Sequence, residues 1–193
     1  PDSQLRTAEF FKKQAAERKA MFETALRQAN PSVTTVFLSI VPEVFCPSLV
    51  RVGSVADGGK WMCNPWAMPK DSVVFSLGSN GDISFESDLQ KATGNAASIV
   101  TVDMTPASDR TLKGLDKIGA KFVHAMIAPQ TNLTSKPSHY TVADLMRSMG
   151  HNQIEILKMD IEGERATITS QSISINELQI MVEIHAIKGT QSC

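Results

Sequence analysis

The sequence has few cysteines, almost no net charge and no long apolar run. Its three cysteines form no C-x-x-C or clustered Cys/His pattern, so we expect no metal site of the structural zinc type. Nineteen Lys and Arg against twenty Asp and Glu give a net charge of −1, and we therefore expect no nucleic-acid partner. No run reaches the length of a membrane span, and no signal peptide is visible. Because the chain begins at Pro1 and not at Met, we expect a mature or shortened form of a longer chain.

The chain has 193 residues, which is the length of one domain, and 42% of them are hydrophobic, which is enough for a core. Residues 3–29 are rich in Ala, Glu, Lys, Arg and Gln, with apolar residues close to helical spacing, and Asn30-Pro31 ends the run. We therefore expect an N-terminal helix segment over residues 1–31. This helix is predicted either to lie on the surface of the domain or to contact a second subunit.

Residues 32–70 are expected to form a lead-in segment that contains a hairpin. Two short runs that contain apolar residues flank an Asp57-Gly58-Gly59 turn: Leu49–Gly53 before it and Lys60–Cys63 after it. Two interpretations of that turn stay open: it caps the domain, or it lies at the rim of a ligand pocket.

From residue 71 to residue 193, strands alternate with helices. Strands are predicted over Val73–Leu77, Ile99–Val102, Lys121–Ile127, Ile154–Met159 and Leu178–Ile184, and helices over Phe85–Thr93, about 108–118 and from Thr141 to Gly150. Because parallel strands need crossover connections, this order predicts an α/β fold, a mainly parallel sheet with helices on both faces. In such a sheet the ligand lies at the carboxyl ends of the strands, where the strand order reverses.

A glycine turn, Gly78-Ser79-Asn80-Gly81, follows the first predicted strand. Glycines let the backbone approach a ligand closely, and free N–H groups at a helix start favour an anionic group. The second strand ends in Asp103, whose carboxylate could accept both ribose hydroxyls of a nucleoside or could cap the next helix. The dinucleotide fingerprint needs a third glycine that this turn lacks, which argues against NAD and suits S-adenosylmethionine (SAM).

Acidic residues and a histidine follow the fourth and fifth predicted strands. Asp160 and Glu162 come just after the fourth strand, and His185 follows the fifth. The two carboxylates could orient or deprotonate a hydroxyl or amine of the substrate, or hold a divalent cation, and His185 could act as a general base. The alternatives are that Asp160 fixes its loop by accepting backbone N–H groups and that His185 is structural.

An ordered set of motifs now supports a resemblance. Leu157–Glu164, with the sequence LKMDIEGE, resembles the fourth-strand signature of FkbM-type SAM-dependent methyltransferases, and the longer set is similar to a eukaryotic methyltransferase-like subgroup. That set consists of Cys46, Arg51-x-Gly53, Asp57-Gly58-Gly59-Lys60-Trp61-x-Cys63, Ser76-x-Gly78-x-x-x-Asp82-x-Ser84-Phe85-Glu86, Val102-Asp103-x-Thr105-Pro106, the fourth-strand motif, and Glu183-Ile184-His185. It spans about residues 46–185 in the expected order.

The resemblance implies a fold and a set of roles. The fold is the Rossmann-like, three-layer sandwich of the SAM methyltransferases. The Gly78–Gly81 turn (Gly78, Ser79, Asn80 and Gly81) would line the methionine part of SAM, Asp103 would bind the ribose, and Met104 would lie beside the adenine. Asp160 and Glu162 would face the active crevice. The family sheet has seven strands, and this chain stops about eight residues after the fifth. Two alternatives follow for the sheet edge that would be left open: either the chain is a shortened form that lacks its C-terminal strands, or an N-terminal segment or a partner covers that edge.

Two features depend on the compartment of the protein. Cys46 and Cys63 flank the predicted hairpin and could pair in an oxidising compartment, while two buried thiols are the alternative. Asn132-Leu133-Thr134 is a glycosylation sequon, which matters only in a secreted chain. Members of the subgroup often look secretory or membrane-anchored, so the resemblance favours the secretory pathway over the cytoplasm and favours a Cys46–Cys63 bridge.

The leading hypothesis is a SAM-dependent methyltransferase that acts on oxygen by in-line displacement. The alternatives are a non-catalytic SAM-binding or interaction domain and, less favoured, an NAD-dependent oxidoreductase. The expected partners are a small-molecule or glycan-like substrate and a second copy of the chain, bound through the N-terminal helix or the open sheet edge.

Overall fold

The computed structural model describes residues 2–28, 46–55, 57–161 and 179–182. By its contacts the chain divides into two compact units, residues 1–47 with 186–193 and residues 48–185. The described helix of the first unit is α1 (Asp2–Leu26), which ends before the predicted stop at Asn30-Pro31. Among the described helices, none combines the length and the apolar character that a membrane span requires.

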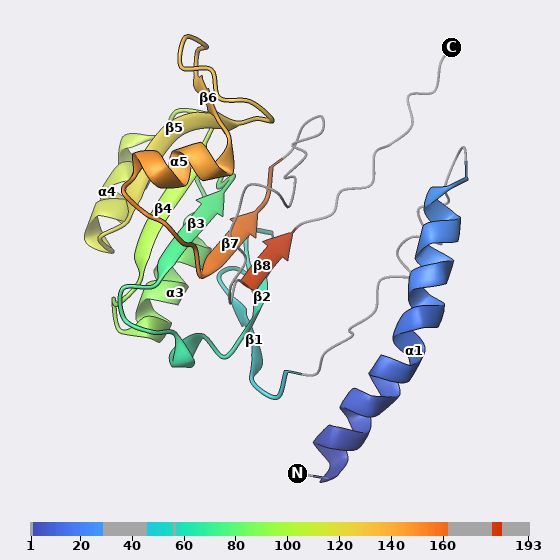
Figure 1. Ribbon diagram of the computed structural model, residues 1–193. Helices are drawn as coiled ribbons and strands as arrows, with labels where there is room; N and C mark the ends of the chain where they lie inside the picture. The colour runs from blue at the N-terminus through green and yellow to red at the C-terminus, as the bar shows by residue number, and fades with distance from the viewer. Residues whose placement is uncertain (1, 29–45, 56, 162–178, 183–193) are drawn as a thin grey trace. The chain divides into compact units, whose positions relative to one another are not determined.

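The second unit is built on a six-stranded parallel sheet (Figure 1). Its strands are β3 (Val73–Leu77), β4 (Ser98–Asp103), β5 (Lys121–Ile127), β6 (Ser138–Tyr140), β7 (Ile156–Met159) and β8 (Gln179–Val182), in the spatial order β6-β5-β4-β3-β7-β8. Every neighbouring pair is parallel. This arrangement confirms the predicted α/β, Rossmann-like fold. The observed β8 lies within the predicted fifth strand.

Alternate residues of the central strands pack on the two faces of the sheet. Phe75 and Leu77 belong to a core shared with α5 (Val142–Ser148), whereas Val74 belongs to a core shared with α3 (Ser84–Thr93). Figure 1 accordingly shows α5 and α3 on opposite sides of the sheet. Because both faces are covered, all five residues of β3 are buried, as expected for a central parallel strand, and all of them except Ser76 are apolar.

Each α-helix that the structure describes in this unit has a local sequence signal at one of its ends. The side chain of Thr141 caps α5 by accepting from the Asp144 N–H, and Ser108 caps α4 (Asp109–Lys117) by accepting from the Thr111 N–H. Gly94, with φ +64°, ends α3 in the left-handed conformation.

One strand was not predicted. Ser138–Tyr140 lies outside the predicted strands and helices, but it forms β6 beside β5. The three residues are half-buried and carry no apolar alternation that would distinguish them from a loop. Their pairing with Ala125, Met126 and Ile127 is what makes them a strand.

The predicted hairpin is confirmed as β1 (Leu49–Val52) and β2 (Lys60–Cys63), which pair antiparallel. The amide of Gln179 on β8 joins this hairpin to the sheet, because it donates to the Cys63 carbonyl at 3.0 Å and accepts from the Cys63 N–H at 3.2 Å. Both described cysteines, Cys46 and Cys63, are disulfide-bonded, so the alternative of free thiols is not the one observed.

Candidate functional site

The strand order reverses beside β3. The chain runs from β3 outward through β4, β5 and β6, and then returns to the other side of β3 with β7 and β8. The carboxyl ends of β3, β4 and β7 therefore meet at one switch point, which is where an open parallel sheet binds its ligand. The glycine turn, Asp103 and Asp160 follow these three strands.

The glycine turn is tightly packed at its first residue. Gly78 has φ +80°, and a Cβ atom there would collide with the backbone oxygen of Asp160. Its N–H donates to the Val102 carbonyl at 2.8 Å, and its carbonyl accepts from the Lys158 ammonium at 2.8 Å. Gly78 thus lets the ends of β3 and β7 approach each other, which no residue with a side chain would allow.

Asp103 holds the rest of the turn in place. Its Oδ2 accepts from the N–H groups of Ser79 and Asn80 at 2.9 and 2.8 Å, and its Oδ1 accepts from the Thr105 N–H at 2.8 Å. Burial by itself raises the pKa of this carboxyl, but the three donated N–H groups and the Ser79 hydroxyl outweigh burial and lower the pKa below its ordinary value. Asp103 is therefore an ionised anchor of the turn.

The turn does not offer the free N–H groups that the sequence led us to expect. The N–H groups of Ser79 and Asn80 go to Asp103, that of Gly81 points to the Ser79 hydroxyl, and that of Asp82 donates to the Ser79 carbonyl. The end of β1 covers the start of α3, since the Ser54 N–H donates to the Ser84 hydroxyl at 3.0 Å. A diphosphate needs several uncommitted N–H groups, and those of the turn from Ser79 to Asp82 already have partners.

The carboxylate of Asp160 forms a buried ion pair with Lys60. The Lys60 Nζ lies 2.9 Å from the Asp160 Oδ2, and their side chains are only 9% and 18% exposed. Lys60 lies on β2, one hundred residues earlier in the chain. Lys60 belongs to the motif from Asp57 to Cys63, and no role was predicted for it, although a charge on the same strand face as the buried Met62 was the signal for one.

Two further ionisable side chains are buried near the glycine turn. Glu86 on α3 is fully buried and Lys158 on β7 is 1% exposed. Burial raises the pKa of Glu86 and lowers the pKa of Lys158, and the attraction between the two charges opposes both shifts. Because the Lys158 ammonium donates to the Gly78 carbonyl at 2.8 Å, Lys158 holds the first residue of the turn. Neither residue was predicted from the sequence to belong to the site.

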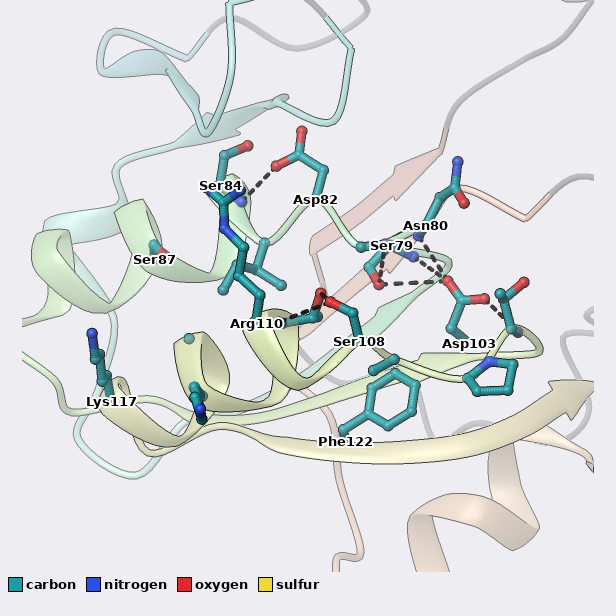
Figure 2. A pocket seen from close by; sticks show the side chains of 18 residues that line it. Ser79, Asn80, Asp82, Ser84, Ser87, Asp103, Ser108, Arg110, Lys117 and Phe122 are labelled. Atoms are coloured by element: carbon teal, nitrogen blue, oxygen red, sulfur yellow. Dashed lines mark hydrogen bonds between the residues drawn. The ribbon is translucent and has the colours of Figure 1, made fainter.

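A groove of about 1020 Å³ opens between the glycine turn, the start of α3 and the length of α4 (Figure 2). Ser79, Asn80, Gly81 and Asp103 line it together, so the fold brings four of the predicted cofactor residues to one place. Its other walls are mostly polar and carry the exposed side chains of Arg110, Lys113 and Lys117.

The other predicted site residues lie apart from this groove or outside the described residues. Gly78 and Asp160 pack against each other at the ends of β3 and β7. Met104 is 54% exposed, and its carbonyl lies 3.0 Å from the His124 Nε2. Glu162 and His185 fall outside the described residues. Within the described ranges, no group of three or more His, Cys, Asp or Glu is arranged to hold a metal ion.

The fold and this corner define a class of protein: an α/β protein with a polar groove at a topological switch point of its parallel sheet. A family model described as a methyltransferase domain matches residues 7–193. The chain therefore belongs to a methyltransferase domain family. Neither the curated proteins nor the solved structures contain a significant match to it.

Proposed function

We propose that this methyltransferase domain uses SAM and transfers its methyl group to an oxygen of the substrate. The observation that carries the cofactor assignment is the commitment of the turn N–H groups to Asp103 and Ser79. SAM carries no phosphate, so it can lie against such a turn, whereas NAD would need free donors for its diphosphate. The same geometry disfavours the NAD-dependent alternative.

The residues of the turn fit a nucleoside. Each oxygen of a carboxylate has about two acceptor positions, and the Thr105 N–H is the described donor on the Asp103 Oδ1, which leaves that oxygen room for a ribose hydroxyl. We propose that Asp103 accepts that hydroxyl, that Gly78, Ser79, Asn80 and Gly81 line the methionine part, and that Met104 covers the adenine. When bound, SAM supplies an electrophilic methyl group on a sulfonium.

The residues proposed to act on the substrate are Asp160, Glu162 and His185. Asp160 lies at the end of β7, beside the turn, and Lys60 holds its carboxylate in one position. A carboxylate at this point can accept the proton of a substrate hydroxyl while the methyl group is transferred. We propose the same role, or that of orienting the hydroxyl, for Glu162 and His185, and we propose a small-molecule or glycan-like substrate.

The test is a calorimetric titration of S-adenosylhomocysteine into the wild-type chain, Asp103→Ala and Asp116→Ala. Asp116 is an exposed carboxylate on α4 that does not line the groove, so its loss makes the same charge change elsewhere. Removing Asp103 leaves three N–H groups and a ribose hydroxyl without their acceptor. The binding free energy should weaken by on the order of 1–3 kcal/mol, roughly tenfold or more in affinity.

The outcomes separate the hypotheses. Binding by the wild type and Asp116→Ala, with loss in Asp103→Ala, supports the SAM site. Tighter binding of NAD than of S-adenosylhomocysteine would contradict it. If S-adenosylhomocysteine binds but no hydroxyl-bearing compound is methylated when SAM is supplied, the chain is the non-catalytic SAM-binding domain.

A further inference from the structure

The loop between β5 and β6 exposes the sequon Asn132-Leu133-Thr134. All three residues are exposed, and Leu133 is 61% exposed although it is apolar. Of the asparagines in the chain, Asn132 and Asn30 have a Ser or Thr two positions later, and Pro31 follows Asn30. A proline in the middle position prevents glycosylation, so Asn132 lies in the one acceptor sequence of the chain.

The sequon is folded in a compact turn. The carboxamide oxygen of Asn132 accepts from the Thr134 N–H at 3.0 Å and from the Thr134 hydroxyl at 2.7 Å. The Asn132 Nδ2 donates no hydrogen bond to any residue that the structure describes. The two Thr134 donors thus fix the orientation of the carboxamide through its oxygen, and the nitrogen faces solvent. This nitrogen is the atom that glycosylation modifies.

The backbone of Asn132 is placed at the edge of the sheet. Its N–H and carbonyl exchange hydrogen bonds of 3.0 and 2.9 Å with His139 on β6. The neighbouring Tyr140 directs its carbonyl to Ala128, which follows β5, so the Asn132 bridge uses the opposite edge of β6. A glycan on Asn132 would therefore project from the outer edge of β6 without displacing a core residue.

A second observation concerns the compartment. Cys46 and Cys63 are disulfide-bonded in the structure, and disulfides persist in oxidising environments such as the secretory pathway. Asparagine sequons are glycosylated in the same pathway. The disulfide bond and the exposed sequon lie in different parts of the sequence and point to the same compartment.

We propose that the protein passes through the secretory pathway and carries an N-linked glycan on Asn132. The Asn132 Nδ2 forms a bond with the anomeric carbon of an oligosaccharide carried on a polyprenyl diphosphate. The bond between that carbon and the diphosphate oxygen breaks, the diphosphate leaves with the electron pair, and Nδ2 loses one proton. No oxidation or reduction takes place. The proposal does not depend on the methyltransferase reaction.

The experiment expresses the chain in animal cells behind an added signal sequence and analyses the protein from the secretory lumen. The wild type should migrate as a heavier species that peptide N-glycosidase converts to the bare chain, leaving Asp at position 132 in the mass spectrum. Asn132→Gln and Thr134→Val should lose the heavier species. Thr134→Ser keeps the hydroxyl and should retain it, whereas the isosteric Thr134→Val does not.

Unmodified Asn132 in the wild type would overturn the proposal, as would a heavier species that survives in Asn132→Gln. The Asn30-Pro31-Ser32 sequence serves as an internal control and should stay unmodified in every variant. The peptide that contains Asn132 should also be glycosylated in the protein isolated from its natural source, and an unmodified peptide there would likewise reject the proposal.

Discussion

At the scale of single residues, charged side chains occupy positions where the strand pattern leads one to expect apolar ones. Lys60 shares a buried face of β2 with Met62, and Lys158 lies within the buried β7. Each ammonium has a defined partner, the Asp160 carboxylate for Lys60 and the Gly78 carbonyl for Lys158. A buried charge is tolerated only when it is paired, so both lysines are evidence of an organised site at the ends of β3 and β7.

The ion pair between Lys60 and Asp160 makes a residue-scale prediction. Lys60→Met leaves the Asp160 carboxylate, 18% exposed, without its ammonium, and should lower the free energy of unfolding by on the order of 3 kcal/mol. Lys91→Met is the matched control. Its ion pair with Asp88 has the same 2.9 Å separation but is 76% and 46% exposed, so its loss should change stability little. Urea denaturation of both variants gives the comparison, and equal effects would contradict the prediction.

At the scale of elements, the glycine turn links three strands. Gly78 hydrogen-bonds to Val102 at the end of β4, packs on Asp160 at the end of β7, and follows β3 directly. The turn was predicted from its glycines and from the apolar run before it. Its packing against β7 was not, because nothing local to Gly78 indicates which distant strand lies beside it.

Two alanine substitutions separate backbone strain from packing at this turn. Gly78 and Gly150 have nearly the same φ, +80° and +79°, but a Cβ on Gly150 meets nothing within 4 Å. In Gly150→Ala the free energy of unfolding should therefore fall only by the cost of a left-handed alanine, about 1 kcal/mol. In Gly78→Ala the free energy of unfolding should fall by roughly 1–3 kcal/mol more, because the Asp160 backbone must move to make room for the Cβ atom. Thermal unfolding measures both, and Gly78→Ala should also weaken S-adenosylhomocysteine binding. Equal losses of stability would show that the close approach of β3 and β7 is not required.

At the scale of the whole molecule, the buried Glu86 couples folding to pH. Burial raises its pKa above the ordinary 4.5, so over the interval between the two values the folded chain binds more protons than the unfolded chain. The contribution of Glu86 to the free energy of unfolding therefore falls as pH rises through that interval and then levels off. Lys158, whose pKa burial lowers, contributes in the opposite sense at higher pH, below its ordinary 10.5.

Glu86→Gln removes this titration, so the stability of the wild type relative to the variant should decline as pH rises from about 4.5. Lys158→Met removes the opposing positive charge and should extend the declining interval to higher pH. Urea unfolding of the three proteins across a pH series measures the effect. A difference between wild type and Glu86→Gln that is independent of pH would contradict it.

Local sequence patterns were enough to predict the described α-helices of the second unit, most of its strands and the ordered set of motifs. Each of these depends on local information: apolar runs such as Val73–Leu77, caps such as Thr141, and glycines that end a helix such as Gly94. The same is true of Asp103, which could be placed at the switch point from its position after an apolar strand. The roles proposed for Glu162 and His185 stay predictions.

Only the tertiary structure decided which groups meet. Lys60 and Asp160 are one hundred residues apart, and Lys158 and Gly78 are eighty apart, so no local pattern joins them. It also decided that Ser138–Tyr140 is a strand and that Asp103 takes the N–H groups of the glycine turn. The physical reason is that a hydrogen bond or an ion pair depends on a distance of about 3 Å, and that distance is set by the register of the sheet and not by the identity of neighbouring residues.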